Sequence, residues 1–205
     1  MERGARRALI VAVARDVIAH ADELNRLDQA IGDGDHGTNV RRGFEAVLAE
    51  VDDLAGMSES GALAAAGMLL LNNVGGASGP LYGTLALSMA RNLPGTTGIS
   101  GWIEAFGLAI EDVKRRGKSE PGQKTLLDVL VPVHTSLVAG DDAAVARLAS
   151  VAENAAEATR SMLAVRGRAA FLGQRSVGHV DPGARSASLI FGAIGRVLVE
   201  EFDGK

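Results

Sequence analysis

The sequence has no cysteine and few aromatic residues, and these two absences exclude several classes of protein. Without cysteine, the 205 residues can form no disulfide bond, thiolate metal site or cysteine nucleophile. Aromatic side chains make up 3% of the chain and the formal net charge is -4, so the sequence offers neither stacking platforms nor a basic surface for nucleic acid. We therefore expect no nucleic-acid partner.

The sequence also has little that would direct it to a membrane. No charged segment followed by an apolar run opens it, so we expect a cytoplasmic protein. No charge occurs between Glu59 and Arg91, but Asn72, Asn73 and Pro80 interrupt that stretch after an apolar run too short to cross a bilayer. We expect a buried helix there, no membrane partner, and a single domain over residues 1–205.

The spacing of apolar residues predicts an all-α fold. They recur at helical intervals along nearly the whole chain, whereas alternation with a period of two is almost absent. Eight helices are expected, with a kink at Pro132 in the sixth. Their predicted ranges are 3–24, 38–52, 58–72, 80–90, 99–115, 125–139, 142–165 and 182–202. Turns of contrasting length favour an up-and-down antiparallel array.

Glycine is concentrated in four of the expected loops, at residues 32–37, 75–79, 117–122 and 167–183. These loops follow the first, third, fifth and seventh predicted helices. In an antiparallel array every second loop lies at the same end of the molecule. The four loops are therefore predicted to meet on one rim, which is the predicted site.

Three carboxylates, Asp28, Asp33 and Asp35, lie within eight residues of one another among glycines. Like charges this close repel and raise one another's pKa, so all three stay ionised only with a cation between them. Oxygen ligands without cysteine favour Mg2+ or Ca2+. A solvated loop, in which Asp and Gly are common, is the alternative.

Two segments resemble familiar phosphate-binding motifs, but the residues around them do not fit either motif. Gly32, Gly34 and Gly37 spell GxGxxG, yet a helical segment precedes them and two aspartates lie inside the motif, where they would repel phosphate. Gly117 begins a Gly-Lys-Ser sequence, but Asp112 stands where a P-loop needs glycine. The loop at 75–80 leads into a helix N-terminus, which either attracts anions or is an ordinary turn.

Four long segments together carry a resemblance to a known family. They read LNRLDQAIGDGDHGTN (24–39), NVGGASGPLYGT (73–84), GKSEPGQKTLLDVL (117–130) and RGRAAFLGQRSVGHVDPGARS (166–186). They resemble the nucleotide-binding L subunit of phosphotransferase-system-dependent dihydroxyacetone kinase and the homologous C-terminal domain of the ATP-dependent enzymes. The resemblance spans nearly the whole chain.

What the resemblance implies is an eight-helix antiparallel barrel whose loop rim holds ADP, or ATP, through two Mg2+ ions. It assigns Asp28, Asp33 and Asp35 to the metal and names no catalytic residue. The residues assigned to the nucleotide are His36, Gly37, Thr38, Asn39, Ala77, Ser78, Gly79, Gly117, Leu126, Arg168, Asp181, Pro182 and Gly183. The chain departs from the family at two positions, since Leu126 stands where many relatives have Met and Gln123 replaces a frequent Asp.

The resemblance further implies a function within a multi-component kinase. Bound ADP takes a phosphoryl group from a phosphohistidine donor subunit of the phosphotransferase system and gives it to dihydroxyacetone held by a separate kinase subunit. The chain alone is then expected to be inactive. Alternatives are an ATP-dependent kinase subunit for another small ketose or polyol, a fatty-acid kinase-like nucleotide domain, and a non-enzymatic nucleotide-sensing helical module. The sequence leaves both a monomer and a homodimer open.

Overall fold

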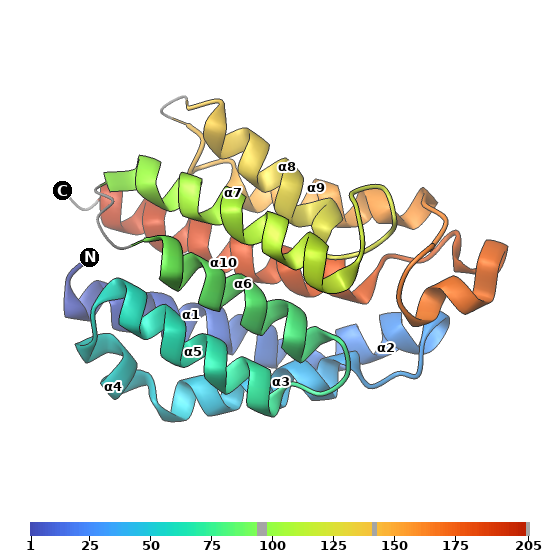
Figure 1. Ribbon diagram of the computed structural model, residues 1–205, viewed down its shortest axis with the longest axis horizontal. Coiled ribbons are helices and arrows are strands. Elements are labelled where there is room, and N and C mark those ends of the chain that lie inside the picture. Colours follow the sequence, from blue (N-terminus) through green and yellow to red (C-terminus); the bar gives the residue numbers. More distant parts are fainter. Residues whose placement is uncertain (94–97, 141–142, 204–205) are drawn as a thin grey trace.

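The structure is a computed structural model that describes residues 1–93, 98–140 and 143–203, and every regular element in these residues is a helix (Figure 1). The α-helices are α1 (Arg3–Ala19), α2 (Ala21–Ile31), α3 (His36–Ala49), α4 (Val51–Gly56), α5 (Glu59–Asn73), α6 (Ser78–Asn92), α7 (Gly98–Gly117), α8 (Leu127–Val138), α9 (Leu148–Ala158) and α10 (Pro182–Asp203). Two 3-10 helices, η1 (Thr159–Ser161) and η2 (Arg168–Ser176), follow α9. The prediction of an all-α fold is confirmed.

The division into eight helices is not confirmed, and the first difference lies in the predicted helix 3–24. Helix α1 ends at Ala19, and α2 starts after His20, whose backbone has a φ of -96° and a ψ of 9°. The ring Nδ1 of His20 lies 2.7 Å from the carbonyl oxygen of Asp16, so this carbonyl is shared between the side chain and the helix backbone. Helix α2 then continues to residue 31, which places Asp28 in its last turns and not in a loop.

Two other predicted helices are also shorter than expected. The second predicted helix divides into α3 and α4 at Glu50. The predicted start of the seventh, Asp142, lies outside the described residues. Helix α9 ends before Thr159, whose hydroxyl donates a hydrogen bond of 2.6 Å to the carbonyl of Ala156. The chain turns to an extended conformation at Met162, so no helix reaches residue 165.

The helices lie side by side along the long axis of the molecule, and both chain ends lie at the same end of the bundle (Figure 1). The pairs α5 and α6, α6 and α7, and α9 and α10 pack against each other. The four glycine-rich loops, together with η2, lie at the end opposite the chain termini (Figure 1). They meet there because neighbouring helices run antiparallel, as the loop order predicts.

The core fills the space between the helices, and α8 turns one side toward it. The side chains of Leu127, Leu130 and Val133 on this side are inaccessible to solvent, whereas Val138 near the end of the helix is exposed. Helix α8 continues through Pro132 without ending. The apolar run before Asn72 forms α5. Within the described residues, no helix combines the length and the apolarity that a membrane crossing requires.

Two glycines allow α5 and α6 to approach closely. A Cβ atom at Gly83 of α6 would lie 2.9 Å from the Cβ of Leu71 and 3.1 Å from the backbone oxygen of Gly67, both on α5. A Cβ atom at Gly67 would in turn lie 3.1 Å from the backbone nitrogen of Leu87. Because backbone atoms cannot rotate away as a flexible side chain does, only small residues fit at this contact.

Substitution of Gly83 tests this close contact. We expect Gly83→Ala to lower the free energy of unfolding by about 1–3 kcal/mol, the usual cost of overpacking, despite the higher helix propensity of alanine. Urea unfolding followed by circular dichroism measures the change. Gly4→Ala in α1 is the matched control, because a Cβ there meets no atom within 4 Å. Equal stability of the two variants would contradict the proposed contact.

Candidate functional site

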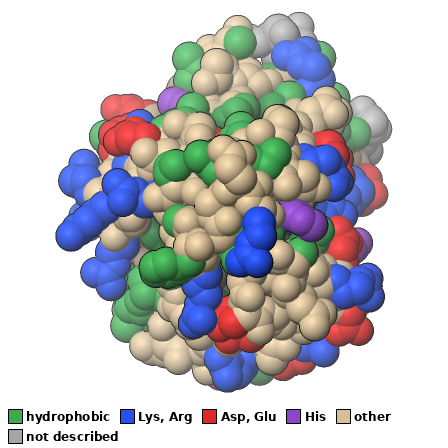
Figure 2. Space-filling model, turned by 90° about the vertical axis from the view of Figure 1, so that its right-hand side faces the viewer, with side chains coloured by type: hydrophobic (Ala, Val, Ile, Leu, Met, Phe, Trp, Pro, Cys, Tyr) green, Lys and Arg blue, Asp and Glu red, His purple; other side chains and the backbone are tan. Residues whose placement is uncertain are grey.

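The end of the bundle that carries the glycine-rich loops contains the candidate site. Figure 2 shows this end face, where basic and apolar side chains are scattered over a large area of backbone and small polar side chains. The helices α3, α6 and α10 all begin at this end, and α7 ends there. Three helix N-termini therefore lie at the same end of the molecule.

The three carboxylates predicted to form a metal site are brought together. One oxygen from each of Asp28, Asp33 and Asp35 lies within 4.8 Å of the others. The buried Asp28 Oδ2 accepts hydrogen bonds from the amides of Asp35 (2.9 Å) and His36 (3.2 Å). Burial raises the pKa of Asp28, whereas these amides lower it. A Cβ at Gly32 would lie 2.2 Å from Asp28 Oδ1, so a larger residue at this position would displace the Asp28 carboxylate.

The donor set of this cluster fits a hard divalent cation. All three candidate ligands are carboxylates, and Asp33 and Asp35 are open to solvent at the rim while Asp28 is anchored beneath them. Arg168, in the first turn of η2, contacts the same cluster through a 2.8 Å ion pair between its Nη1 and Asp33 Oδ2. The cluster thus already has one cationic partner from a segment about 135 residues away in the chain.

His36 connects three helices through a chain of hydroxyl groups. Its Nδ1 lies 3.2 Å from the Oγ of Ser78 on α6, and its Nε2 lies 2.9 Å from the Oγ of Ser186 on α10. The Ser186 hydroxyl lies 2.6 Å from the hydroxyl of the buried Tyr82. Burial lowers the pKa of His36 to about 4, so the ring is neutral and can both donate and accept a hydrogen bond.

The loop before α6 leaves its helix N-terminus open. The residue before the helix is Ala77, and no side chain caps the first turn from that position. A Cβ at Gly79 would lie 2.3 Å from the backbone oxygen of Val74, which explains the need for glycine there. Uncapped amides at a helix N-terminus attract anions such as phosphate.

Other predicted residues of the 36–39 segment have structural partners on neighbouring elements. Thr38 exchanges two hydrogen bonds of 2.9 Å with the side chain of Asn25 on α2. A Cβ at Gly37 would lie 1.8 Å from the backbone oxygen of Ala21, so α3 starts in direct contact with α2. The side chain of Asn39 lies beneath the 75–76 turn, where it accepts a hydrogen bond from Arg42.

The remaining predicted residues form a second group beside the first. A Cβ at Gly183 would lie 3.7 Å from the backbone nitrogen of Leu126, so the starts of α8 and α10 are adjacent. The buried Asp181 caps α10, since its Oδ2 accepts a 2.7 Å hydrogen bond from the amide of Ala184. Burial raises the pKa of Asp181 to about 7. Gly117, at the end of α7, lies close to Leu81 of α6.

The two groups are joined by residues that the sequence did not single out. The carbonyl of Gly183 accepts hydrogen bonds from the hydroxyls of Ser186 (3.0 Å) and Tyr82 (3.3 Å). Tyr82 is the one tyrosine of the chain, and its place in a stretch without charged residues was the signal that could have indicated a buried hydroxyl with a specific hydrogen bond.

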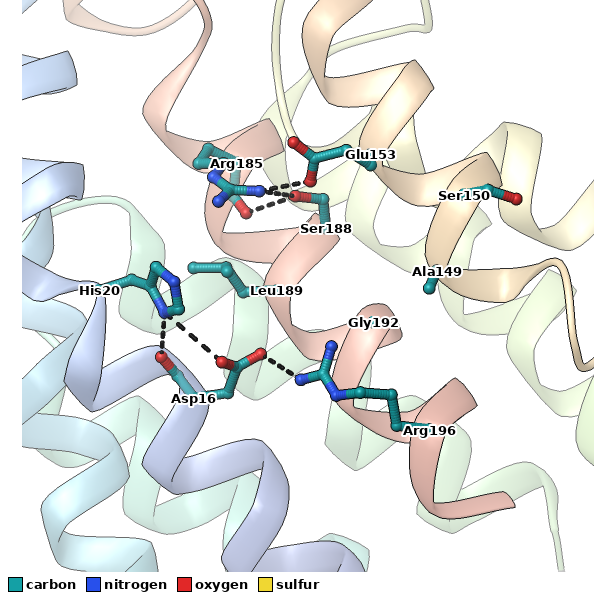
Figure 3. A pocket seen from close by; sticks show the side chains of 10 residues that line it. All are labelled: Asp16, His20, Ala149, Ser150, Glu153, Arg185, Ser188, Leu189, Gly192 and Arg196. Carbon is teal, nitrogen blue, oxygen red and sulfur yellow. Dashed lines mark hydrogen bonds and ion pairs between the residues drawn. The ribbon is translucent and has the colours of Figure 1, made fainter. Parts of the chain in front are cut away.

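A hollow of about 400 Å³ lies between α1, α9 and α10, on the side of the bundle (Figure 3). Its lining is formed by Asp16, His20, Ala149, Ser150, Glu153, Arg185, Ser188, Leu189, Gly192 and Arg196. Arg196 pairs with Asp16 at 2.7 Å, and Arg185 pairs with Glu153 and, at 2.6 Å, with Glu23. The charged groups satisfy one another, so this hollow is an ion-paired contact between helices.

Comparison with known proteins identifies the family. The model of the DAK2 domain matches residues 30–196. The chain belongs to the DAK2 domain family. This DAK2 domain is 41% identical over 175 residues to a protein of Listeria innocua named PEP-dependent dihydroxyacetone kinase 1, ADP-binding subunit DhaL, covering 83% of this chain and 84% of that protein.

Two longer proteins also contain a similar domain. The L-erythrulose 1-kinase of Mycolicibacterium smegmatis is 37% identical over 186 residues, which cover 86% of this chain and 32% of that protein. The crystal structure of the dihydroxyacetone kinase from C. freundii in complex with AMP-PNP and Mg2+ superposes with a TM-score of 0.75 at 23% identity, covering 93% of this chain and 33% of the other. The DAK2 domain therefore shares its fold with one third of that enzyme.

The raised pKa of Asp181 predicts how stability depends on pH. Because the pKa rises from 3.8 to about 7 on folding, the stabilisation is complete below the unfolded value and is lost as pH increases through 7. We expect the stability of the unsubstituted protein relative to Asp181→Asn to fall between about pH 4 and pH 7 and to level off above that range. Urea unfolding in EDTA measures both proteins. His36 is present in both proteins, so its titration cancels in the difference between their free energies of unfolding. If the two free energies changed with pH in parallel, the prediction would be contradicted.

Proposed function

We propose that the chain is the ADP- and Mg2+-binding subunit of a multi-component dihydroxyacetone kinase. Bound ADP would carry a phosphoryl group from a phosphohistidine on a phosphotransferase-system donor to dihydroxyacetone on a partner subunit. The observation that carries this proposal is the cluster of three carboxylates, with oxygens within 4.8 Å, beside the uncapped N-terminus of α6. The relative from Listeria innocua is named as an ADP-binding subunit, and the similarity covers most of both chains, which supports this assignment.

The metal ligands in this proposal are Asp28, Asp33 and Asp35. Two Mg2+ ions, when bound, neutralise phosphate oxygens and so stabilise the charge that develops during phosphoryl transfer. Asp28 is the anchored ligand, because two backbone amides already fix one of its oxygens. Arg168 would add a positive charge beside the phosphates, since its ion pair with Asp33 holds it at the cluster.

The phosphate groups would be held by donors from two helix starts. The amides at the start of α6, with the Ser78 hydroxyl, face the region beside His36. The neutral His36 ring adds no charge there, and its second nitrogen is fixed by Ser186. The wall beside the nucleotide would be formed by Leu126, Gly183 and Gly117. Asp181 and Pro182 fix the start of α10.

A kinase domain that acts on another small ketose is the second candidate. The similarity to the L-erythrulose 1-kinase favours it, because the same domain there belongs to an enzyme named for a different ketose. The residues of the rim are the same in both proposals, since they hold nucleotide and metal and not the sugar. The two candidates differ in whether the nucleotide stays bound or is exchanged.

Retention of the nucleotide separates the two candidates. We expect the protein purified from cells and dialysed with Mg2+ to release about one equivalent of ADP on denaturation, because a coenzyme does not dissociate between turnovers. Chromatography of the supernatant identifies and quantifies it. Dialysis with EDTA should remove the ADP. An empty site that binds ATP reversibly would favour the ATP-dependent kinase, and no binding of either nucleotide would contradict both candidates.

Substitution of Asp33 tests the metal site. We expect Asp33→Asn to weaken Mg2+-dependent ADP binding by about tenfold or more, because it removes a charged ligand from the cluster. Isothermal titration calorimetry gives the dissociation constant. The melting temperature without nucleotide should stay within a few degrees, since Asp33 lies at the surface. Asp53→Asn, an exposed aspartate on α4, is the control and should bind as the unsubstituted protein does.

A further inference from the structure

Lys124 is the largest side chain of the described residues that is almost fully buried, although it carries a charge. Its residue is 1% exposed, and its backbone has a φ of 62° in the segment between α7 and α8. The ammonium donates hydrogen bonds to three backbone carbonyls, those of Thr159 (2.9 Å), Met162 (3.2 Å) and His179. An ammonium has three protons, so these carbonyls complete its hydrogen bonding.

The three carbonyls come from two segments of the chain, which lie on either side of η2 in the sequence. Thr159 and Met162 lie at the end of α9 and η1, where the helix dipole favours a cation, and the carbonyl of Thr159 also accepts a 3.0 Å hydrogen bond from the amide of Met162. His179 belongs to the segment before α10. The ammonium therefore links the α7–α8 segment, the end of α9 and the approach to α10.

Further hydrogen bonds hold these segments around the ammonium. The hydroxyl of Thr159 accepts a 2.9 Å hydrogen bond from the amide of Asp181, and the amide of Gly178 donates to the carbonyl of Arg160 at 2.8 Å. Burial lowers the pKa of Lys124, and the nearby Asp181 opposes that shift. The buried charge is thus compensated by the three carbonyl oxygens and by Asp181.

We propose that the Lys124 ammonium fills a monovalent-cation site made of three carbonyls and so positions the nucleotide wall. Lys124 lies two residues before Leu126, and His179 lies two residues before Asp181. The contact between Lys124 and His179 therefore sets the approach of α8 to α10 at the point where Leu126 faces Gly183. Lys124 is a positioning residue, and its effect on nucleotide binding rests on the proposed function.

Removal of the side chain gives this proposal a specific test. Lys124→Ala leaves a buried polar cavity with three converging carbonyls, which a small ammonium ion can enter because it carries the same charge and donors. In choline chloride we expect this variant to bind ADP about tenfold or more weakly, since charged hydrogen bonds are lost. Methylammonium or ammonium chloride should restore much of the affinity, and tetramethylammonium, which has no donor, should not.

Two control variants separate the cation site from a general loss of packing. Lys124→Met fills the cavity without a charge, so it should also weaken binding but should not respond to ammonium. Lys118→Ala removes an exposed lysine of the same segment that also has a positive φ, of 49°, and it should bind ADP as the unsubstituted protein does. Circular dichroism measures whether the variants keep their helical content, and calorimetry measures ADP binding in each salt.

Measuring the melting temperature without nucleotide tests the cation site independently of the proposed function. Methylammonium should raise the melting temperature of Lys124→Ala and leave that of Lys124→Met unchanged, even if no variant binds ADP. In that case the proposed function would fail and the cation site would stand. Unchanged binding and melting in Lys124→Ala would overturn the inference. A loss that no ammonium ion restores, equal in the alanine and methionine variants, would also overturn it.

Discussion

Repulsion between the carboxylates of Asp28, Asp33 and Asp35 is the constraint on which the rest of the rim depends. Three negative charges within a few ångströms are stable only where neighbouring groups compensate them. Two backbone amides do so for Asp28, and Arg168 does so for Asp33. The cluster therefore requires that the end of α2, the start of α3 and η2 lie together.

Away from the carboxylates, the rim depends on buried polar groups that each have specific partners. His36, Ser186 and Tyr82 form one chain of hydrogen bonds, and Lys124 with Thr159 forms another. A buried polar group without partners is costly, so each of these contacts fixes one arrangement of the loops against others. The glycine-rich loops, which have little conformational preference of their own, gain a defined position from these neighbours.

The sequence predicted the features that depend on local pattern. Apolar spacing predicted helices, the order of the glycine-rich loops predicted that they share one end, and three nearby aspartates predicted a carboxylate cluster. Helix breaks were not predicted, because the break at His20 depends on a side-chain contact with Asp16 that apolar spacing does not report. The role of Lys124 was also missed. Its three acceptors lie 35 to 55 residues away in the chain, and no spacing rule connects them.

The position of the two chain ends limits how the rim can be reached by a covalently attached domain. Helix α10 has 22 residues and runs from the rim to the opposite end, a distance of about 33 Å at 1.5 Å per residue. A linker of roughly ten extended residues after α10 would be as long as the helix itself and could return to the rim of its own chain. The length of such a linker, together with the size of the attached domain, would determine which parts of that domain could reach the rim.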